Sequence, residues 1–123
     1  MTVVAFSTAV SRHGSFSALY LESADNNTVR DSYLENLSGH GARLEAGANG
    51  NAIIRSTLAA GNTADRYGLF VSASSSNTIL GATVYGSTAA LVSASTGTVI
   101  GGSRLTASGA GASGLGLGGG SVN

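Results

Sequence analysis

Hydrophobic residues recur along this chain in short alternating runs rather than at the spacing of an amphipathic helix. Three segments, Asn27–Val29, Asn51–Ile53 and Asn77–Ile79, each place a β-branched residue two positions after an asparagine. Gly97–Val99 repeats the pattern without the asparagine, and Met1–Val3 looks like a further copy in a repeat that begins midway. The copies lie between 20 and 26 residues apart, and self-similarity at such a period is typical of stacked structural units. The pattern therefore predicts a solenoid.

Alignment of the copies on the β-branched residue predicts two columns of equivalent side chains, five residues apart. The first column contains Val3, Val29, Ile53, Ile79 and Val99, and the second contains Thr8, Leu34, Leu58, Val84 and either Arg104 or Leu105. We expect equivalent residues to stack on one another, because each strand of a solenoid pairs in parallel with its counterpart about 4.8 Å away along the axis.

A further strand is expected upstream of these columns, so that each unit contains one pair of strands. It contains the triplets Leu19–Leu21, Ala42–Leu44, Leu69–Val71, Ala90–Val92 and Leu115–Leu117. The outer members of each triplet are small or aliphatic, whereas the middle member varies in type. Because successive side chains point to opposite faces of a strand, the outer pair is expected to face the core and the middle residue the solvent.

The asparagines Asn27, Asn51 and Asn77 are expected to form a structural ladder at one bend of each coil. Asparagine tolerates the left-handed backbone conformation that a tight bend requires, and stacked amides can donate and accept hydrogen bonds between coils. Gly97 is expected to keep the backbone conformation and to lose the amide.

The run Ala18–Val29, together with the matching run Gly68–Ile79, resembles the repeat of right-handed parallel β-helix proteins, the pectin-lyase-like superfamily. The resemblance covers nearly the whole chain. It implies an all-β fold, a single-stranded right-handed parallel β-helix of about four to five coils, in one domain at 1–123 that is either complete or a slice of a longer solenoid. That fold hosts lyases, hydrolases, epimerases, phage tailspikes and adhesins, so the resemblance implies architecture rather than activity.

Composition excludes several classes of function. The formal net charge is zero and charged residues make up 10% of the chain, so no electrostatic attraction to nucleic acid is expected. No run of about 18 apolar residues exists, so membrane insertion is not expected. Cysteine is absent, His13 and His40 lie in different loops, and acidic residues are dispersed; we therefore expect no metal site and no cofactor.

Glu22 and Glu45 are expected to lie one coil apart on the outward face, with Arg43 beside them. Enzymes of the superfamily act on acidic polysaccharides along such a sheet, and two neighbouring carboxylates can supply a general acid and a base. The same residues also fit a solvated charged patch. If the chain is an enzyme, the resemblance implies a polysaccharide lyase, a glycoside hydrolase or an epimerase.

His40 lies within a Gly-His-Gly segment, and Arg55 follows fifteen residues later, as in part of the polygalacturonase signature. The Asn-Thr-Asp segment and the Asp-Asp pair of that family are missing here. His40 and Arg55 therefore remain catalytic candidates beside a simpler interpretation, in which His40 is a loop residue and Arg55 forms an ion pair with Asp31 one coil away.

Tyr20, Phe70, Tyr67 and Arg66 are candidates for carbohydrate binding without catalysis, because aromatic rings and arginine suit sugars and partner surfaces. Beyond Arg66 the chain is almost free of charge.

The missing catalytic pairs, the charge-poor second half and the lack of a capping helix favour a non-catalytic structural or assembly role. We expect a segment of an extracellular fibre, surface protein or phage tail component, located outside the cell, at the cell surface or in a virion. Self-association through the β-helix ends or sides is the expected partnership. The alternative is a carbohydrate-active module that acts on acidic polysaccharide.

Overall fold

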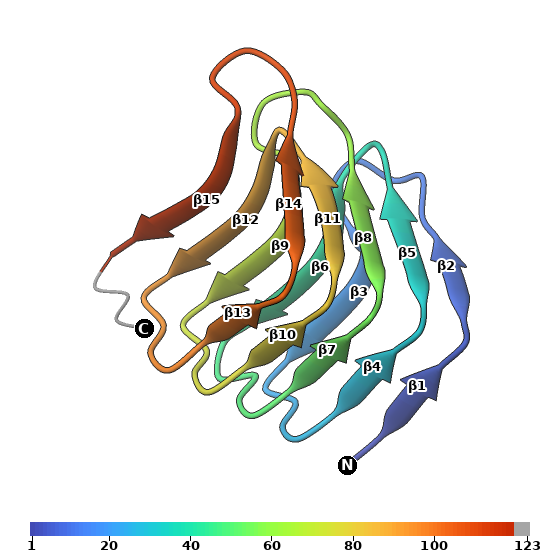
Figure 1. The fold of residues 1–123 in the computed structure, drawn as a ribbon, viewed down its shortest axis with the longest axis vertical. Coiled ribbons are helices and arrows are strands. Elements are labelled where there is room, and N and C mark those ends of the chain that lie inside the picture. Colours follow the sequence, from blue (N-terminus) through green and yellow to red (C-terminus); the bar gives the residue numbers. More distant parts are fainter. Residues whose placement is uncertain (120–123) are drawn as a thin grey trace.

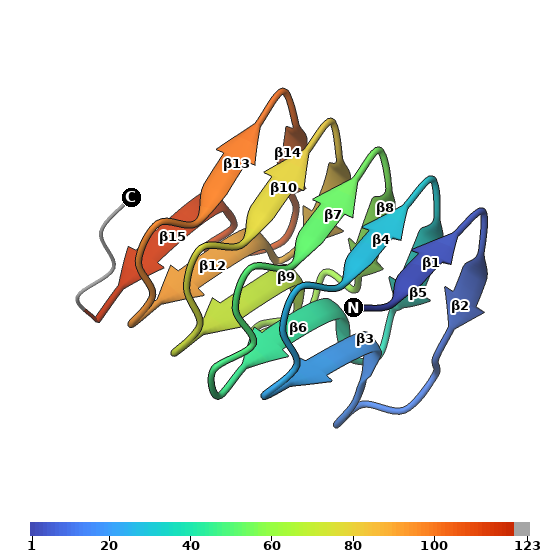
Figure 2. The same cartoon turned by 90° about the horizontal axis from the view of Figure 1, so that it is seen from below.

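Three parallel β-sheets wrap around one core in the computed structural model, which describes residues 1–119 (Figures 1 and 2). Sheet A contains β1 (Val3–Ala5), β4 (Thr28–Arg30), β7 (Ala52–Ile54), β10 (Thr78–Leu80) and β13 (Val99–Gly101). Sheet B contains β2 (Thr8–Val10), β5 (Tyr33–Asn36), β8 (Thr57–Ala60), β11 (Thr83–Gly86) and β14 (Arg104–Ala107). Sheet C contains β3 (Ser17–Glu22), β6 (His40–Glu45), β9 (Tyr67–Ser72), β12 (Thr88–Ser93) and β15 (Ser113–Gly118).

Each coil takes one strand from every sheet, and each strand pairs with its counterparts in the neighbouring coils. The described residues form about five coils, so the predicted all-β right-handed parallel β-helix is confirmed. Within these residues no helix is long and apolar enough to cross a membrane. The predicted single domain at 1–123 includes residues 120–123, which lie outside the described residues, and it stays a prediction.

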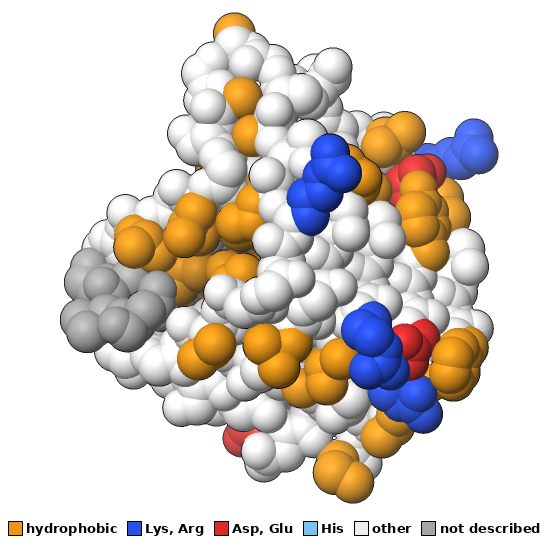
Figure 3. Space-filling model, viewed as in Figure 1, with side chains coloured by type: hydrophobic (Ala, Val, Ile, Leu, Met, Phe, Trp, Pro, Cys, Tyr) orange, Lys and Arg blue, Asp and Glu red, His pale blue; other side chains and the backbone are white. Residues whose placement is uncertain are grey.

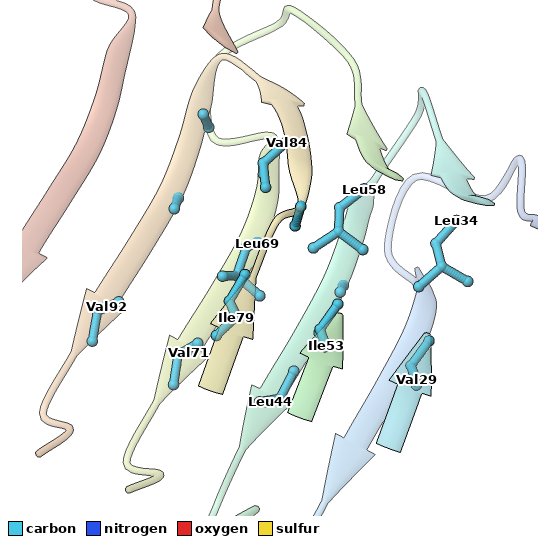
Figure 4. Close-up of a cluster of buried hydrophobic side chains, with 14 of the residues drawn as sticks. Val29, Leu34, Leu44, Ile53, Leu58, Leu69, Val71, Ile79, Val84 and Val92 are labelled. Carbon is cyan, nitrogen blue, oxygen red and sulfur yellow. The ribbon is translucent and has the colours of Figure 1, made fainter. Parts of the chain in front are cut away.

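The core consists of aliphatic rows that run along the solenoid axis, one or two from each sheet (Figure 4). The rows of the middle coils contain Val29, Ile53 and Ile79 from sheet A, Leu34, Leu58 and Val84 from sheet B, and Leu44, Val71 and Val92 from sheet C. These side chains are at most 2% exposed, as expected when like residues stack in register over several coils.

The predicted first column is wrong by one residue in the outermost coils. Val4, rather than Val3, pairs with Val29, and Ile100, rather than Val99, continues the column at the other end. Val3 and Val99 point outward and are each 53% exposed. Val3-Val4 and Val99-Ile100 are pairs of consecutive β-branched residues. Either member of such a pair fits the core position of an alternating pattern, so the pattern cannot distinguish the two registers.

The second column needs the same correction in the first coil. Ala9, rather than Thr8, pairs with Leu34. In the last coil Leu105, one of the two predicted alternatives, takes the core position, and Arg104 is exposed. The register error in the first coil is therefore common to both columns.

Each coil contains three strands, not the predicted pair, because a sharp corner separates sheet A from sheet B. The corner residue has a positive φ in every coil, including Asp31 at 51° and Arg55 at 45°. The following serine stabilises the corner: the backbone N–H of Ser32 donates to Oγ of Ser56 at 3.2 Å. Because phenylalanine and arginine, which occupy the corner at Phe6 and Arg55, are not typical turn residues at positive φ, the sequence pattern did not indicate this corner.

The asparagine ladder is present, but its backbone conformation differs from the prediction. The residue before each asparagine has the positive φ: 57° at Asn26, 65° at Gly50 and 57° at Ser76. Gly97, at 62°, belongs to this column, so Thr98 replaces the asparagine in the last coil. Asparagine is used here for its amide and not for its backbone tolerance.

Hydrogen bonds through the ladder run from backbone to side chain across coils. Oδ1 of Asn51 accepts the backbone N–H of Asn27 at 2.8 Å, and Oδ1 of Asn77 accepts that of Asn51 at 2.9 Å. The amide nitrogen of Asn51 donates to the carbonyl oxygen of Ala24 at 2.7 Å. Each buried asparagine thus satisfies backbone groups that the bend would leave unpaired.

Candidate functional site

The outward face of sheet C carries a row of large side chains at the middle positions of the predicted triplets. Tyr20, Arg43 and Phe70 are paired in register on β3, β6 and β9, as the sequence predicts. The guanidinium carbon of Arg43 lies 5.5 Å from the centroid of the Tyr20 ring and 5.6 Å from that of Phe70. The cation therefore lies between two aromatic rings of neighbouring coils, a favourable electrostatic arrangement.

His40 and Tyr67 extend this row at the start of β6 and β9. Their rings are stacked, with centroids 5.2 Å apart and planes inclined by 6°. The Tyr67 ring also stacks on Phe70, with centroids 5.2 Å apart. The sequence did not indicate this stack, because His40 and Tyr67 lie outside the triplets and are 27 residues apart.

The contacts of the His40 imidazole favour its neutral form. Nδ1 of His40 accepts the backbone N–H of Tyr67 at 3.2 Å, so the ring proton resides on Nε2. Burial lowers the pKa of His40 below its ordinary value of 6.5, and the positive charges of Arg43 and Arg66 lower it further. His40 thus contributes a flat apolar surface and one donor rather than a free base.

Glu22 and Glu45 lie in register on neighbouring coils, as expected for a carboxylate pair. Nη2 of Arg43 donates to both carboxylate oxygens of Glu45, at 2.6 and 2.7 Å, and this ion pair is less than one third exposed. Desolvation raises the pKa of the nearby Tyr20, and the charges of the two glutamates add to that rise. Glu45 is therefore bound by Arg43, and Glu22 and Glu45 do not form a pair of two free carboxylates.

Arg55 does not join the other candidates. It lies between β7 and β8, at the corner of sheets A and B, and donates from Nε and Nη2 to Asp31 at 2.8 and 2.9 Å. Arg30 also donates to Asp31, at 3.0 Å. The hydrogen bond from Arg55, more than any other effect, lowers the pKa of Asp31. The expected ion pair is therefore present, on a different part of the surface from His40.

Arg66 immediately precedes Tyr67 and so lies at the edge of the aromatic row. Its backbone carbonyl accepts a hydrogen bond from Oγ of Ser87 at 3.0 Å, which holds the loop against the next coil. The charge of Arg66 lowers the pKa of His40, and the charge of Asp65 raises it. The four carbohydrate-binding candidates therefore lie on or beside one face.

A buried asparagine, Asn36, positions the loop that precedes β3, and the repeat pattern did not indicate this role. The Nδ2 group of Asn36 donates to the carbonyl oxygens of His13 and Phe16, each at 2.9 Å. The backbone N–H of His40 donates to the same Phe16 carbonyl at 3.2 Å. A Cβ atom at Gly39 would lie 2.6 Å from Nδ2 of Asn36, so this close packing requires glycine.

The loop and the row of rings enclose a shallow hollow of about 240 Å³, lined by Ser15, Phe16, Ser17, Tyr20 and Arg43. Phe16 is 61% exposed and Tyr20 is 49% exposed, so both rings are open to a ligand. Phe16 and Ser17 follow neither the triplet pattern nor any motif, which explains why they were not predicted as site residues.

Metal ligands are not gathered at this face. Among residues 1–119, no three side chains of His, Cys, Asp or Glu are grouped so that they could hold a metal ion. His40 uses Nδ1 for the backbone of Tyr67, and His13 accepts the backbone N–H of Ser15 through Nδ1 at 3.3 Å.

A family model of known proteins matches this chain. The family model described as "Periplasmic copper-binding protein (NosD)" matches residues 5–122. No curated protein and no solved structure gives a significant match. Because the match covers nearly the whole chain and the fold is the right-handed β-helix of the pectin-lyase-like type, this chain belongs to the NosD family.

Proposed function

We propose that this chain is a non-catalytic β-helix module of an extracytoplasmic protein and that it binds carbohydrate on the outward face of sheet C. The observation that carries the proposal is the row on one face in which Tyr20, Arg43 and Phe70 are paired in register and the ring of Tyr67 stacks on that of Phe70. Aromatic faces offer apolar contact area, and a few fixed polar groups beside them orient a ligand. The description of the family as periplasmic supports the extracytoplasmic location.

Binding without turnover is favoured because four of the five candidate catalytic groups, all except the exposed Glu22, are engaged in internal contacts. Glu45 is bound by Arg43, Nδ1 of His40 is bound by a backbone N–H, and Arg55 is bound by Asp31. A general acid and base need free groups within reach of the reacting atoms. These contacts instead fix the shape of the face, as a binding surface requires.

A structural or assembly role is the second candidate, favoured by the exposed ends of the core. Leu115 and Leu117 on β15 are 46% and 58% exposed, and Figure 3 shows hydrophobic side chains gathered at this end of the solenoid. The end strands match in length in two of the three sheets: β1 and β13 have three residues each, and β3 and β15 have six, whereas β2 has three and β14 has four. A second copy would extend sheets A and C in parallel with matched strands, and sedimentation velocity at increasing concentration tests this role.

The copper named in the family description does not fit the donors of this chain. Copper sites in proteins use histidine, cysteine and methionine side chains brought close together. The chain lacks cysteine, its single methionine is the 95% exposed Met1, and the described residues hold no suitable group of ligands. We therefore propose no copper-dependent step.

The carbohydrate proposal is tested by isothermal titration against a panel of neutral and acidic oligosaccharides. Tyr20→Ala and Phe70→Ala should each weaken binding about tenfold, because each removes one stacking surface. Tyr85→Ala is the matched control, since Tyr85 is 38% exposed but lies on sheet B. Absence of binding to every member of the panel, or equal losses in the control, would refute the proposal.

A further inference from the structure

The loop between β6 and β7 contains the single Asn-Gly sequence of this chain, Asn49-Gly50. Both residues are exposed. Asparagine is a chemically labile residue, and glycine after it favours deamidation, because glycine has no side chain to hinder attack of its backbone nitrogen on the asparagine amide. The pair is therefore a candidate site of spontaneous modification, and the contacts around it decide when the reaction can occur.

Hydrogen bonds to the next coil hold both groups that would react. Oδ1 of Asn49 accepts the backbone N–H of Ser75 at 2.7 Å, and the backbone N–H of Gly50 donates to the carbonyl oxygen of Ser75 at 3.0 Å. Nδ2 of Asn49 donates to the carbonyl oxygen of Gly47 at 2.8 Å. The backbone of Ser75 therefore binds the amide that would be attacked and also the nitrogen that would attack it.

The preceding coil binds the same loop from the other side. The backbone N–H of Asn49 donates to Oδ1 of Asp25 at 2.8 Å, and the carbonyl oxygen of Asn49 accepts the backbone N–H of Asn26 at 3.0 Å. Asp25 and Asn49 thus each accept a backbone N–H from the following coil, in an exposed row beside the buried asparagine ladder. These contacts fix the backbone of Asn49 on both sides, although its side chain is exposed to water.

We propose that Asn49 is a deamidation site that the folded solenoid shields and that opening of this loop makes reactive. Hydroxide removes the proton of the Gly50 backbone nitrogen, which then attacks Cγ of Asn49. The new N–Cγ bond closes a succinimide, and Nδ2 leaves as ammonia after it takes a proton from water. A second water molecule opens the ring at either carbonyl and gives aspartate or isoaspartate. Because the Gly50 proton is bound by Ser75, the first step requires the two coils to separate locally.

The products fit this loop less well than asparagine does. A carboxylate at position 49 cannot donate to the carbonyl oxygen of Gly47, and it adds a negative charge one coil away from Asp25. Isoaspartate also adds a carbon to the backbone just before Asn51, which is 1% exposed and binds the backbone of Asn27. Deamidation should therefore convert a reversible opening of the solenoid into an irreversible one.

The test incubates the whole chain in mildly alkaline buffer, in one sample folded and in the other in urea above the unfolding midpoint. Peptide mapping by mass spectrometry measures conversion of the Asn49 amide to an acid. Conversion should be at least about tenfold slower in the folded chain, because it proceeds only through the opened loop. Asn62 is exposed and is followed by Thr63, whose side chain hinders the attack, so this internal control should convert slowly in both samples.

Two variants connect the shielding and its consequence to named contacts. Asp25→Ala removes the acceptor of the Asn49 N–H, so it should raise the folded-state rate several-fold and leave the rate in urea unchanged. Asp65→Ala removes another exposed aspartate and should change neither rate. Asn49→Ser removes the amide and introduces the residue found at the equivalent position of the next coil, Ser75. After long incubation in urea, Asn49→Ser should refold fully, whereas the unaltered chain should lose refolding yield in step with deamidation.

Each of these measurements can overturn the inference, and none depends on carbohydrate binding. Equal rates in the folded and unfolded chain would refute the shielding, and the absence of conversion at Asn49 in urea would refute the site. A folded Asp25→Ala variant that reacts as slowly as the unaltered chain would contradict the role of the loop contacts. An equal loss of refolding yield in Asn49→Ser would show that deamidation at this site does not cause the irreversibility.

Discussion

Arg43 binds Glu45, two residues away on the outward face of β6, through hydrogen bonds from one nitrogen to both carboxylate oxygens. The same guanidinium lies between the rings of Tyr20 and Phe70. The pair therefore neutralises a carboxylate and fixes the spacing of two rings at once. It explains how a face with several charged groups can serve as an apolar platform.

Glu45→Gln should increase affinity for trigalacturonate several-fold, because the charge of Arg43 is no longer offset. Stability should change by less than about 1 kcal/mol, since the ion pair remains partly solvated. Titration calorimetry and urea unfolding measure the two effects. Glu35→Gln, on sheet B, is the control and should leave affinity unchanged. An unchanged or weaker affinity in Glu45→Gln would contradict the electrostatic account.

Asn51→Ala should lower the free energy of unfolding by about 1–3 kcal/mol. Asn51 is 1% exposed, and its loss leaves the backbone N–H of Asn27 and the carbonyl of Ala24 without their side-chain partner. Chemical denaturation measures the change. Asn62→Ala, at an exposed position, should be neutral. Equal effects of the two substitutions would show that the ladder contributes little.

Gly39→Ala should destabilise the chain by about 1–3 kcal/mol and weaken glycan binding, because the added Cβ displaces Asn36 or the Phe16 carbonyl. Phe16 would then no longer form a wall of the hollow. Thermal unfolding and titration calorimetry report the two effects. Gly114→Ala is the matched control, since a Cβ there meets no atom within 4 Å. The account fails if Gly39→Ala is as stable as this control.

Stability should decrease as the pH falls below about 6.5, because the pKa of His40 is lower in the folded chain than in the unfolded one. In this window the unfolded state binds a proton that the folded state does not. His40→Gln should flatten the dependence between about pH 6.5 and the folded pKa, whereas carboxylates act at lower pH. Urea unfolding from about pH 5 to pH 8 measures it, and an unchanged slope in His40→Gln would contradict this assignment.

Much of the fold was predictable because aliphatic residues repeat without ambiguity in the middle coils. Leu34, Leu58 and Val84 have no aliphatic neighbour larger than alanine, so one register satisfies them. In the outermost coils the doublet Val3-Val4 fits either register, and hydrogen bonding between strands decides it. The corner between sheets A and B was not predicted, because Phe6 and Arg55 have positive φ there although neither residue type prefers that conformation.

The candidate site was also predicted only where its residues follow the regular repeat. Tyr20, Arg43 and Phe70 occupy equivalent repeat positions, so the alignment placed them in one column. Phe16 and Ser17 lie at or beside an irregular loop whose path depends on contacts with the next coil. A repeat alignment contains no information about such contacts, so the hollow could be recognised in the structure alone.

At the corner between sheets A and B, the backbone keeps one conformation although the side chain differs from coil to coil. Phe6, Asp31, Arg55, Gly81 and Gly102 occupy its five equivalent positions, and all have positive φ. The neighbouring residue, which is serine in four of the five coils, supplies the hydrogen bonds that hold the corner. The corner residue is therefore free to vary. A row of chosen side chains could be placed at these positions without redesign of the core. Neighbouring side chains in that row would be about 4.8 Å apart, one from each coil.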